Sequence, residues 1–228
     1  MKSDSLLTGR LHRFYDLAGR NAAPFLVIFY IVGTVGTINP LSRPFFLILF
    51  PFAILLSFAF LLAYPGYKTD VKTWLMVVLI AIAGYAIEVA GVNTGVIFGR
   101  YSYGHTFGLK VFETPLLIGI NWALLVFASA SVAEKLNIPP VIKIFIASLI
   151  MLFYDLFLEV SAGKLDMWTW EGGRVPLLNY LAWFVTALAM HSLLRLFGLK
   201  PSFRLALPVL ACQTLFFILL AIYFNFAK

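Results

Sequence analysis

Seven apolar stretches, most of them near twenty residues long, constrain the fold of this chain more than any other feature. A helix needs about 20 residues to cross the hydrocarbon core of a bilayer, and helices satisfy their own backbone hydrogen bonds there. Only 12% of the 228 residues are charged, against about 25% in soluble domains. The stretches are 22–38, 43–64, 71–93, 114–133, 139–158, 176–197 and 203–226.

We therefore predict an all-α fold, a polytopic membrane bundle of about seven transmembrane helices that forms one domain over residues 1–228. The cell membrane is the expected location. Asn39-Pro40 and Arg43-Pro44 leave only a very short turn between the first two stretches, so a re-entrant hairpin is the alternative there.

The distribution of lysine and arginine predicts the orientation. The net charge is +7, but no long basic run of the kind that binds nucleic acid is present, so no nucleic-acid partner is expected. An N-terminus inside and a C-terminus outside agree with the positive-inside rule. The inner set is then Lys2, Arg10, Arg13, Arg20, Lys68, Lys72, Lys135, Lys143, Arg195, Lys200 and Arg204, and the outer set is Arg43, Arg100, Lys110, Lys164, Arg174 and Lys228.

Four acidic residues lie in or at the mouth of these stretches, near the predicted outer face: Glu88, Glu113, Asp155 and Glu159. Acidic residues inside a membrane are costly and usually functional. Asp155 and Glu159 are four residues apart and share one helix face, where two neighbouring carboxylates cannot both ionise cheaply. These acids are the candidate catalytic residues.

Each acid also has a structural interpretation. Glu88 could hold helices together through Asn121, and Glu113, just before Thr114-Pro115, could interact only with a helix dipole. Glu159 could lie in headgroup water while a buried Asp155 forms an ion pair with a base. The basic candidates for that pair are Arg100, Lys164 and Arg174.

A weak internal repeat relates the two long outer connections, roughly 94–113 and 159–175. Each copy has an acid followed by valine, an aromatic-polar-aromatic triplet, and Pro-Leu-Leu-x4-Trp. The triplets are Tyr101-Ser102-Tyr103 and Trp168-Thr169-Trp170, and the closing residues are Trp122 and Trp183. If the repeat is not a coincidence, helices 3–4 and 5–6 are parallel repeats that share a site. The aromatic residues fit an interfacial belt, and beside acids they could also stabilise a cation.

Several classes of protein lack support in the sequence. The three histidines show no metal-ligand spacing, so no metal is expected, and no phosphate-binding glycine loop is present. A retinal protein is excluded because no lysine lies between Arg204 and Lys228 in the last helix to form a Schiff base.

Two blocks of residues form a longer pattern. The first is Glu88-x2-Gly91-x-Asn93-Thr94-Gly95-x2-Phe98-Gly99-x-Tyr101-x-Tyr103 followed by Glu113-Thr114-Pro115-x2-Ile118-x2-Asn121-Trp122, and the second is Asp155-x3-Glu159, Trp168-Thr169-Trp170 and Pro176-x2-Asn179-x3-Trp183. Over about residues 70–197 this pattern resembles the membrane carotenoid 1,2-hydratases of the CruF type. One departure is Val160, where the family pattern has proline after the acid.

The resemblance implies a cofactor-independent enzyme that adds water across the terminal C1–C2 double bond of lycopene, γ-carotene or a similar linear carotenoid. Asp155 is the expected proton donor, while Glu88 and Glu159 steady the cation or activate water, and Glu113 is a further candidate acid. The expected substrate-binding residues are Tyr101, Tyr103, Trp168, Trp170, Asn93, Asn121, Trp122 and Asn179. The particular carotenoid and the oligomeric state stay open.

Two alternatives remain. A membrane carotenoid cyclase of the lycopene type would start with the same protonation but needs a drier pocket, and the polar loop residues favour hydration over it. A non-enzymatic carotenoid or lipid carrier, or a proton-coupled transporter, would use the acids as a relay. Such a relay should extend across the bilayer, but the inner halves of the helices hold few titratable groups.

Overall fold

The computed structural model describes residues 21–65 and 70–226. Within them lie seven helices that are long and apolar enough to cross a membrane, which confirms the predicted helical bundle. They are Asn21–Ile38, α2 (Arg43–Ala63), α3 (Val71–Thr94), α4 (Leu117–Glu134), α5 (Pro140–Ala162), α6 (Leu177–Leu196) and α7 (Ala206–Phe226). The first two helices each reach a length that can span the bilayer, so the two-helix prediction holds over the re-entrant alternative.

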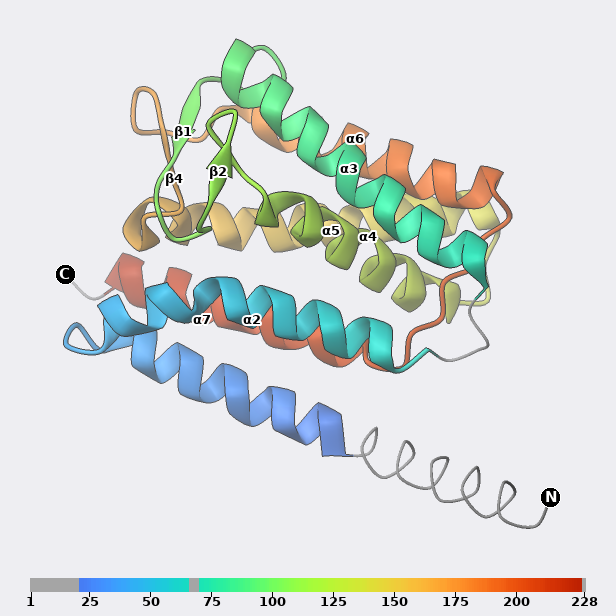
Figure 1. Cartoon of the computed structure of the whole chain (residues 1–228), viewed down its shortest axis with the longest axis horizontal. Helices are drawn as coiled ribbons and strands as arrows, with labels where there is room; N and C mark the ends of the chain where they lie inside the picture. The colour runs from blue at the N-terminus through green and yellow to red at the C-terminus, as the bar shows by residue number, and fades with distance from the viewer. Residues whose placement is uncertain (1–20, 66–69, 227–228) are drawn as a thin grey trace.

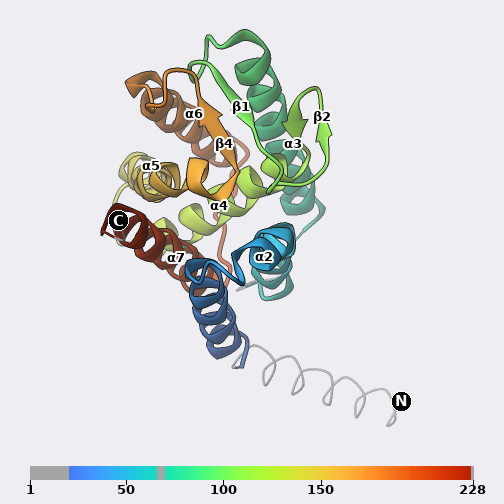
Figure 2. The ribbon, with the colours of Figure 1, turned by 90° about the vertical axis from the view of Figure 1, so that its left-hand side faces the viewer.

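Helix α4 forms the centre of the bundle. Fifteen of its eighteen residues are buried, and it packs against α2, α3, α5 and α7, which surround it in the view along the bundle (Figure 2). Glycines allow the close approach of α3, because a Cβ atom on Gly84 would overlap the side chain of Trp122, and one on Gly119 would overlap the Ala81 carbonyl. Small residues serve this purpose in membrane helix interfaces generally.

Local signals in the sequence fix the ends of α3. Asp70 is the N-cap, and its carboxylate accepts the backbone N–H of Thr73 at 2.9 Å, as short acidic side chains do at this position. Gly95 ends the helix in the left-handed conformation with φ 67°, and its N–H donates to the Gly91 carbonyl. Glu88 therefore lies less than two turns from the end of α3.

Four short strands lie at one end of the bundle, the end that also holds the C-terminal end of α7 (Figure 1). Strand β1 (Tyr101–Tyr103) pairs antiparallel with β4 (Trp168–Trp170), and β2 (Lys110–Val111) pairs antiparallel with β3 (Thr114–Pro115). A 3-10 turn, η1 (Gly163–Leu165), connects α5 to β4. These strands cover the helix ends that carry the candidate acids.

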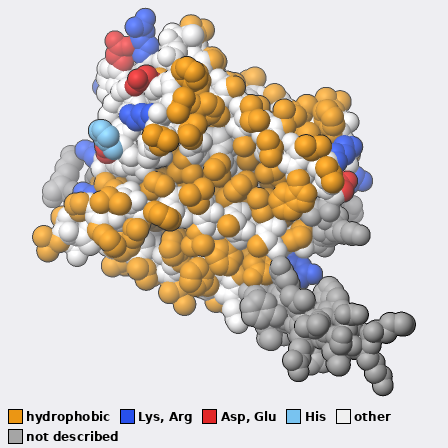
Figure 3. Space-filling model, viewed as in Figure 1, with side chains coloured by type: hydrophobic (Ala, Val, Ile, Leu, Met, Phe, Trp, Pro, Cys, Tyr) orange, Lys and Arg blue, Asp and Glu red, His pale blue; other side chains and the backbone are white. Residues whose placement is uncertain are grey.

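The flank of the bundle is apolar. Hydrophobic side chains cover the visible face between its ends, and charged side chains gather toward the two ends (Figure 3). On α2, for example, Ile48 and Phe52 are 72% and 66% exposed, a pattern that marks an interaction surface when it is extensive and that suits contact with lipid. The orientation stays a prediction, and Lys2, Arg10, Arg13, Arg20, Lys68 and Lys228 lie outside the described residues.

Candidate active site

Glu88 lies on α3 beneath strand β1 and is only 3% exposed. Its Oε2 atom accepts hydrogen bonds from the hydroxyls of Tyr101 at 2.5 Å and Tyr103 at 2.8 Å. Its Oε1 atom accepts the indole N–H of Trp122 at 2.9 Å. Three donors therefore surround this acid, and the predicted structural partner Asn121 is not one of them.

Glu159 lies on α5 beneath strand β4 in a similar arrangement and is 6% exposed, so it does not lie in headgroup water. Its Oε2 atom accepts the indole N–H groups of Trp168 at 3.0 Å and Trp170 at 2.8 Å. Its Oε1 atom accepts the amide of Asn179, on α6, at 2.9 Å. Because Val160 has a backbone N–H where proline would have none, α5 continues unbroken to Ala162.

Asp155 lies one helical turn deeper on α5 and is fully buried. Its Oδ2 atom accepts a hydrogen bond from Asn179 at 3.2 Å, so this one amide bridges Asp155 and Glu159. Its Oδ1 atom has no hydrogen-bond partner among the described residues. Arg100, Lys164 and Arg174, the basic partners considered from the sequence, form no ion pair with Asp155. The Nε atom of Arg100 lies instead 3.8 Å from Oε2 of Glu171.

Strands β1 and β4 bring the two aromatic triplets face to face. The first residue of each triplet pairs with the last residue of the other, which is the register that a local two-fold axis produces. The middle residues Ser102 and Thr169 share a hydroxyl contact of 3.4 Å at the centre of the pair. Glu88 and Glu159 each accept two of their three hydrogen bonds from the triplet that follows them in the chain, so the two motifs build similar halves of one cluster.

The closing tryptophans of the repeat also meet. The rings of Trp122 and Trp183 stack with centroids 4.2 Å apart and an interplanar angle of 23°. The halves differ four residues before each repeat acid, where α3 has Gly84 and α5 has Asp155. The Trp122 side chain packs against Gly84. Only α5 therefore has two acids one helical turn apart, Asp155 and Glu159.

The two tyrosines of β1 act as neutral donors. Burial is the main cause that raises the pKa of the Tyr101 and Tyr103 hydroxyls above the usual range, and the adjacent Glu88 carboxylate raises it further. Loss of the phenolic proton would place a negative charge beside that carboxylate, which is unfavourable in buried surroundings. Both hydroxyls therefore keep their protons.

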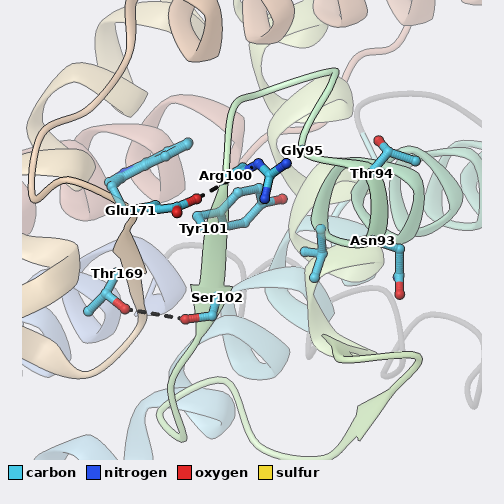
Figure 4. A pocket seen from close by; sticks show the side chains of 10 residues that line it. Asn93, Thr94, Gly95, Arg100, Tyr101, Ser102, Thr169 and Glu171 are labelled. Atoms are coloured by element: carbon cyan, nitrogen blue, oxygen red, sulfur yellow. Dashed lines mark hydrogen bonds and ion pairs between the residues drawn. The ribbon is translucent and has the colours of Figure 1, made fainter.

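Two aromatic rings lie between a small cavity and a larger, more open pocket. The small cavity, about 10 Å³, is lined by Glu88 and Glu159 and has room for about one water molecule. The open pocket, about 460 Å³, is lined by polar groups that include Ser102 and Thr169 (Figure 4). The rings of Tyr101 and Trp170, with centroids 4.9 Å apart, line both spaces.

The structure leaves Glu113 outside the acid cluster. This residue is exposed in the two-residue turn between β2 and β3, where Phe112 and Glu113 have φ angles of 51° and 59°. The expectation that Thr114-Pro115 opens a helix was wrong, since these residues form β3 and α4 begins at Leu117. The extra hairpin therefore separates Glu113 from a helix N-terminus.

The remaining predicted residues take different places. Asn93 donates to the carbonyls of Val89 and Phe112 and lines the open pocket rather than the cavity. Asn121 is buried, and its Oδ1 atom has no partner among the described residues. Sequence reasoning did not assign three cavity-lining residues to the site, Phe98, Ile118 and Trp183, although all three belong to the two motif blocks. Within 21–65 and 70–226, no group of histidine, cysteine and acidic side chains could hold a metal ion.

Two sequence comparisons identify the family of the chain. Residues 47–227 match the family described as carotenoid biosynthesis protein. The bisanhydrobacterioruberin hydratase of Haloarcula japonica is 25% identical over 201 residues, which cover 78% of this chain and 65% of that relative's length. No solved structure matches. The family match includes every residue of the acid cluster, and the chain belongs to the carotenoid biosynthesis protein family.

Proposed function

We propose that the protein adds water across the terminal C1–C2 double bond of a linear carotenoid. The hydrogen-bond inventory of the three buried acids carries this proposal. Glu88 and Glu159 each accept three hydrogen bonds, whereas Asp155 accepts one and has an oxygen without a partner. The name of the Haloarcula japonica relative, a hydratase, supports the same reaction class.

Asp155 is the proton donor in this proposal. An indole N–H can only donate, so Glu159, which accepts two of them, is best matched as a carboxylate. The oxygen of Asp155 that has no hydrogen-bond partner can carry the proton. Transfer of that proton to C2 leaves a tertiary cation at C1, a step that general acid catalysis accelerates by about 10²–10⁴-fold.

The surrounding groups stabilise the cation. Glu88 and its three donors provide a fixed negative group that lines the same small cavity as Glu159. Trp183 also lines this cavity, with its ring stacked on that of Trp122, and aromatic faces attract cations. Preorganised groups of this kind need little rearrangement during the reaction.

Water completes the reaction. A water molecule that enters from the open polar pocket past Tyr101 and Trp170 attacks C1, and Glu159 takes the proton that the water loses. The Asn179 NH2 group donates to both acids and holds them close together, and the proton returns from Glu159 to Asp155 through a water molecule, because an amide NH2 group cannot accept it. The sum of these steps adds one water to the alkene, consumes no proton and needs no cofactor.

An isotope experiment tests the proposal. Purified protein is incubated with lycopene or γ-carotene in heavy-oxygen water, and the pigments are analysed by mass spectrometry. A product that gains one labelled hydroxyl supports hydration. A ring without label would assign the protein to the cyclase alternative, and unchanged pigment would favour a carrier.

A further inference from the structure

A second cavity of about 350 Å³ lies away from the acid cluster, between the Asn21–Ile38 helix, α2, α7 and Tyr154 of α5. Its volume is within the range of about 300–1,000 Å³ that small-molecule sites occupy. Phenylalanine rings dominate the lining, among them Phe46, Phe50, Phe216 and Phe217. We call this space the phenylalanine groove.

The groove is open to the lipid side of the bundle. Phe52 and Val32 line it and are 66% and 53% exposed, so an apolar molecule in the bilayer can enter without crossing water. Gly33 widens it, because the nearest atom to a Cβ built there is a Phe216 ring carbon 4.0 Å away. A larger residue at position 33 would occupy the groove itself.

One buried polar side chain distinguishes the groove from an ordinary lipid-facing surface. Gln213 lines it and is 3% exposed, and its Oε1 atom has no hydrogen-bond partner among the described residues. The neighbouring polar side chains are satisfied: the hydroxyls of Tyr30 and Ser57 bond to each other at 2.7 Å, and Thr34 donates to the Tyr30 carbonyl. A buried amide oxygen without a donor is costly, and a ligand hydroxyl would satisfy it.

Aromatic contacts connect the groove to the acid cluster. Tyr154 lines the groove and directly precedes Asp155 on α5. Phe107 lies between the two sites, because its ring centroid is 5.5 Å from that of Phe50 in the groove and 5.9 Å from that of Trp168 in the cluster. The groove and the acid cluster are therefore neighbours, with aromatic side chains between them.

We propose that the phenylalanine groove binds the hydroxyl-bearing end of a carotenoid, with Gln213 Oε1 as the hydrogen-bond acceptor for the hydroxyl. The phenylalanine rings would pack against the polyene chain that follows. This inference rests on the proposed function for the source of the alcohol, since hydration produces a tertiary hydroxyl in a site next to the groove. The groove then holds the product as it moves toward the bilayer.

Binding measurements test this proposal without any turnover. Asp155→Asn protein in detergent is titrated with lycopene and with 1-hydroxylycopene, and the visible absorption and induced circular dichroism of the pigment give the Kd of each. Three second substitutions are compared in that background. Gln213→Leu removes the acceptor, Gly33→Phe fills the groove, and Val35→Phe is the matched control, because Val35 is 64% exposed on the same helix and does not line the groove.

We expect Gln213→Leu to weaken binding of the hydroxylated pigment by roughly tenfold, the size of one lost buried hydrogen bond, and to leave lycopene binding unchanged. Gly33→Phe should weaken both pigments, and Val35→Phe neither. Equal effects of Gln213→Leu on both pigments would overturn the assignment of the acceptor. Unchanged binding in the Gly33→Phe protein would show that the groove holds only lipid chains or water, and would also overturn it.

The outcomes separate this proposal from the hydratase proposal. If the isotope experiment yields no labelled alcohol while Gln213→Leu still selects against the hydroxylated pigment, the groove is a binding site and the hydratase proposal fails. If labelled alcohol forms while neither groove variant changes binding, the hydratase proposal stands and the groove proposal fails. Thermal unfolding of each variant verifies that the compared proteins are folded.

Discussion

Replacing Glu159 with leucine should destabilise the protein as well as inactivate it. The substitution leaves the indole N–H groups of Trp168 and Trp170 and one amide N–H of Asn179 without their present acceptor. Each buried donor left unsatisfied costs about 1–3 kcal/mol. Several kcal/mol is a large part of the roughly 5–15 kcal/mol by which folded proteins are stable.

Glutamine at the same position separates stability from chemistry. Its amide oxygen can accept both indole N–H groups, and its NH2 group can face Asn179, whose side chain can rotate to offer its oxygen. Glu159→Gln should therefore unfold within a few degrees of the unmodified protein. It cannot take a proton from water, and the loss of a general base lowers rates by about 10²–10⁴-fold.

The assay combines thermal unfolding in detergent with the rate at which heavy oxygen enters the carotenoid. The expected pattern is a low melting temperature for Glu159→Leu only, and slow hydration for both variants. Full hydration activity in Glu159→Gln would refute the role of Glu159 as the base. An unchanged melting temperature in Glu159→Leu would refute the reasoning that its hydrogen bonds stabilise the end of the bundle.

Three further predictions follow from the same contacts. Asp155→Asn should keep the melting temperature, because Asp155 accepts one hydrogen bond of 3.2 Å, but should lower the labelled-hydroxyl rate by about 10²–10⁴-fold; an active Asp155→Asn protein would exclude it as the donor. His191→Leu breaks two buried hydrogen bonds, to the hydroxyls of Ser129 and Ser148, while both hydroxyls still donate to backbone carbonyls. The free energy of unfolding should therefore fall by roughly 1–3 kcal/mol, and the hydration rate of the folded protein should not change. The raised pKa values of Tyr101 and Tyr103 stabilise the folded protein fully below pH ~10, the pKa of an unfolded tyrosine, and this stabilisation is lost as the pH rises above that value. Chemical unfolding at several pH values should show the free energy of unfolding decline above pH ~10, and a variant with phenylalanine at both positions should show a smaller decline.

The helices and the acids could be predicted because each depends on residues close together in the chain. A contiguous apolar stretch defines each span, and the spacing of Asp155 and Glu159 places them on one helix face by geometry alone. The partners of the acids could not be predicted in the same way. Trp122 reaches Glu88 across 34 residues, and only the packed arrangement of α3 and α4 brings them together.

The aromatic triplets make a contact that neither sequence interpretation included. They were expected to form an interfacial belt or to line a substrate pocket, and in the structure their polar ends also donate to the two glutamates. The hairpin that displaces Glu113 had no sequence signal. Its turn places Phe112 and Glu113 at positive φ, where asparagine and glycine are the usual residues.

The inequality between Gly84 and Asp155 has a stereochemical consequence for the proposed reaction. In the proposed reaction the proton comes from Asp155, and α3 has glycine at the matching position, so only one face of a flat trisubstituted alkene is protonated. A hydrogen isotope delivered from heavy water should therefore enter the methylene group at C2 with a single configuration. The two similar halves thus differ in their proton donor, and this difference selects one of the two faces of an achiral substrate.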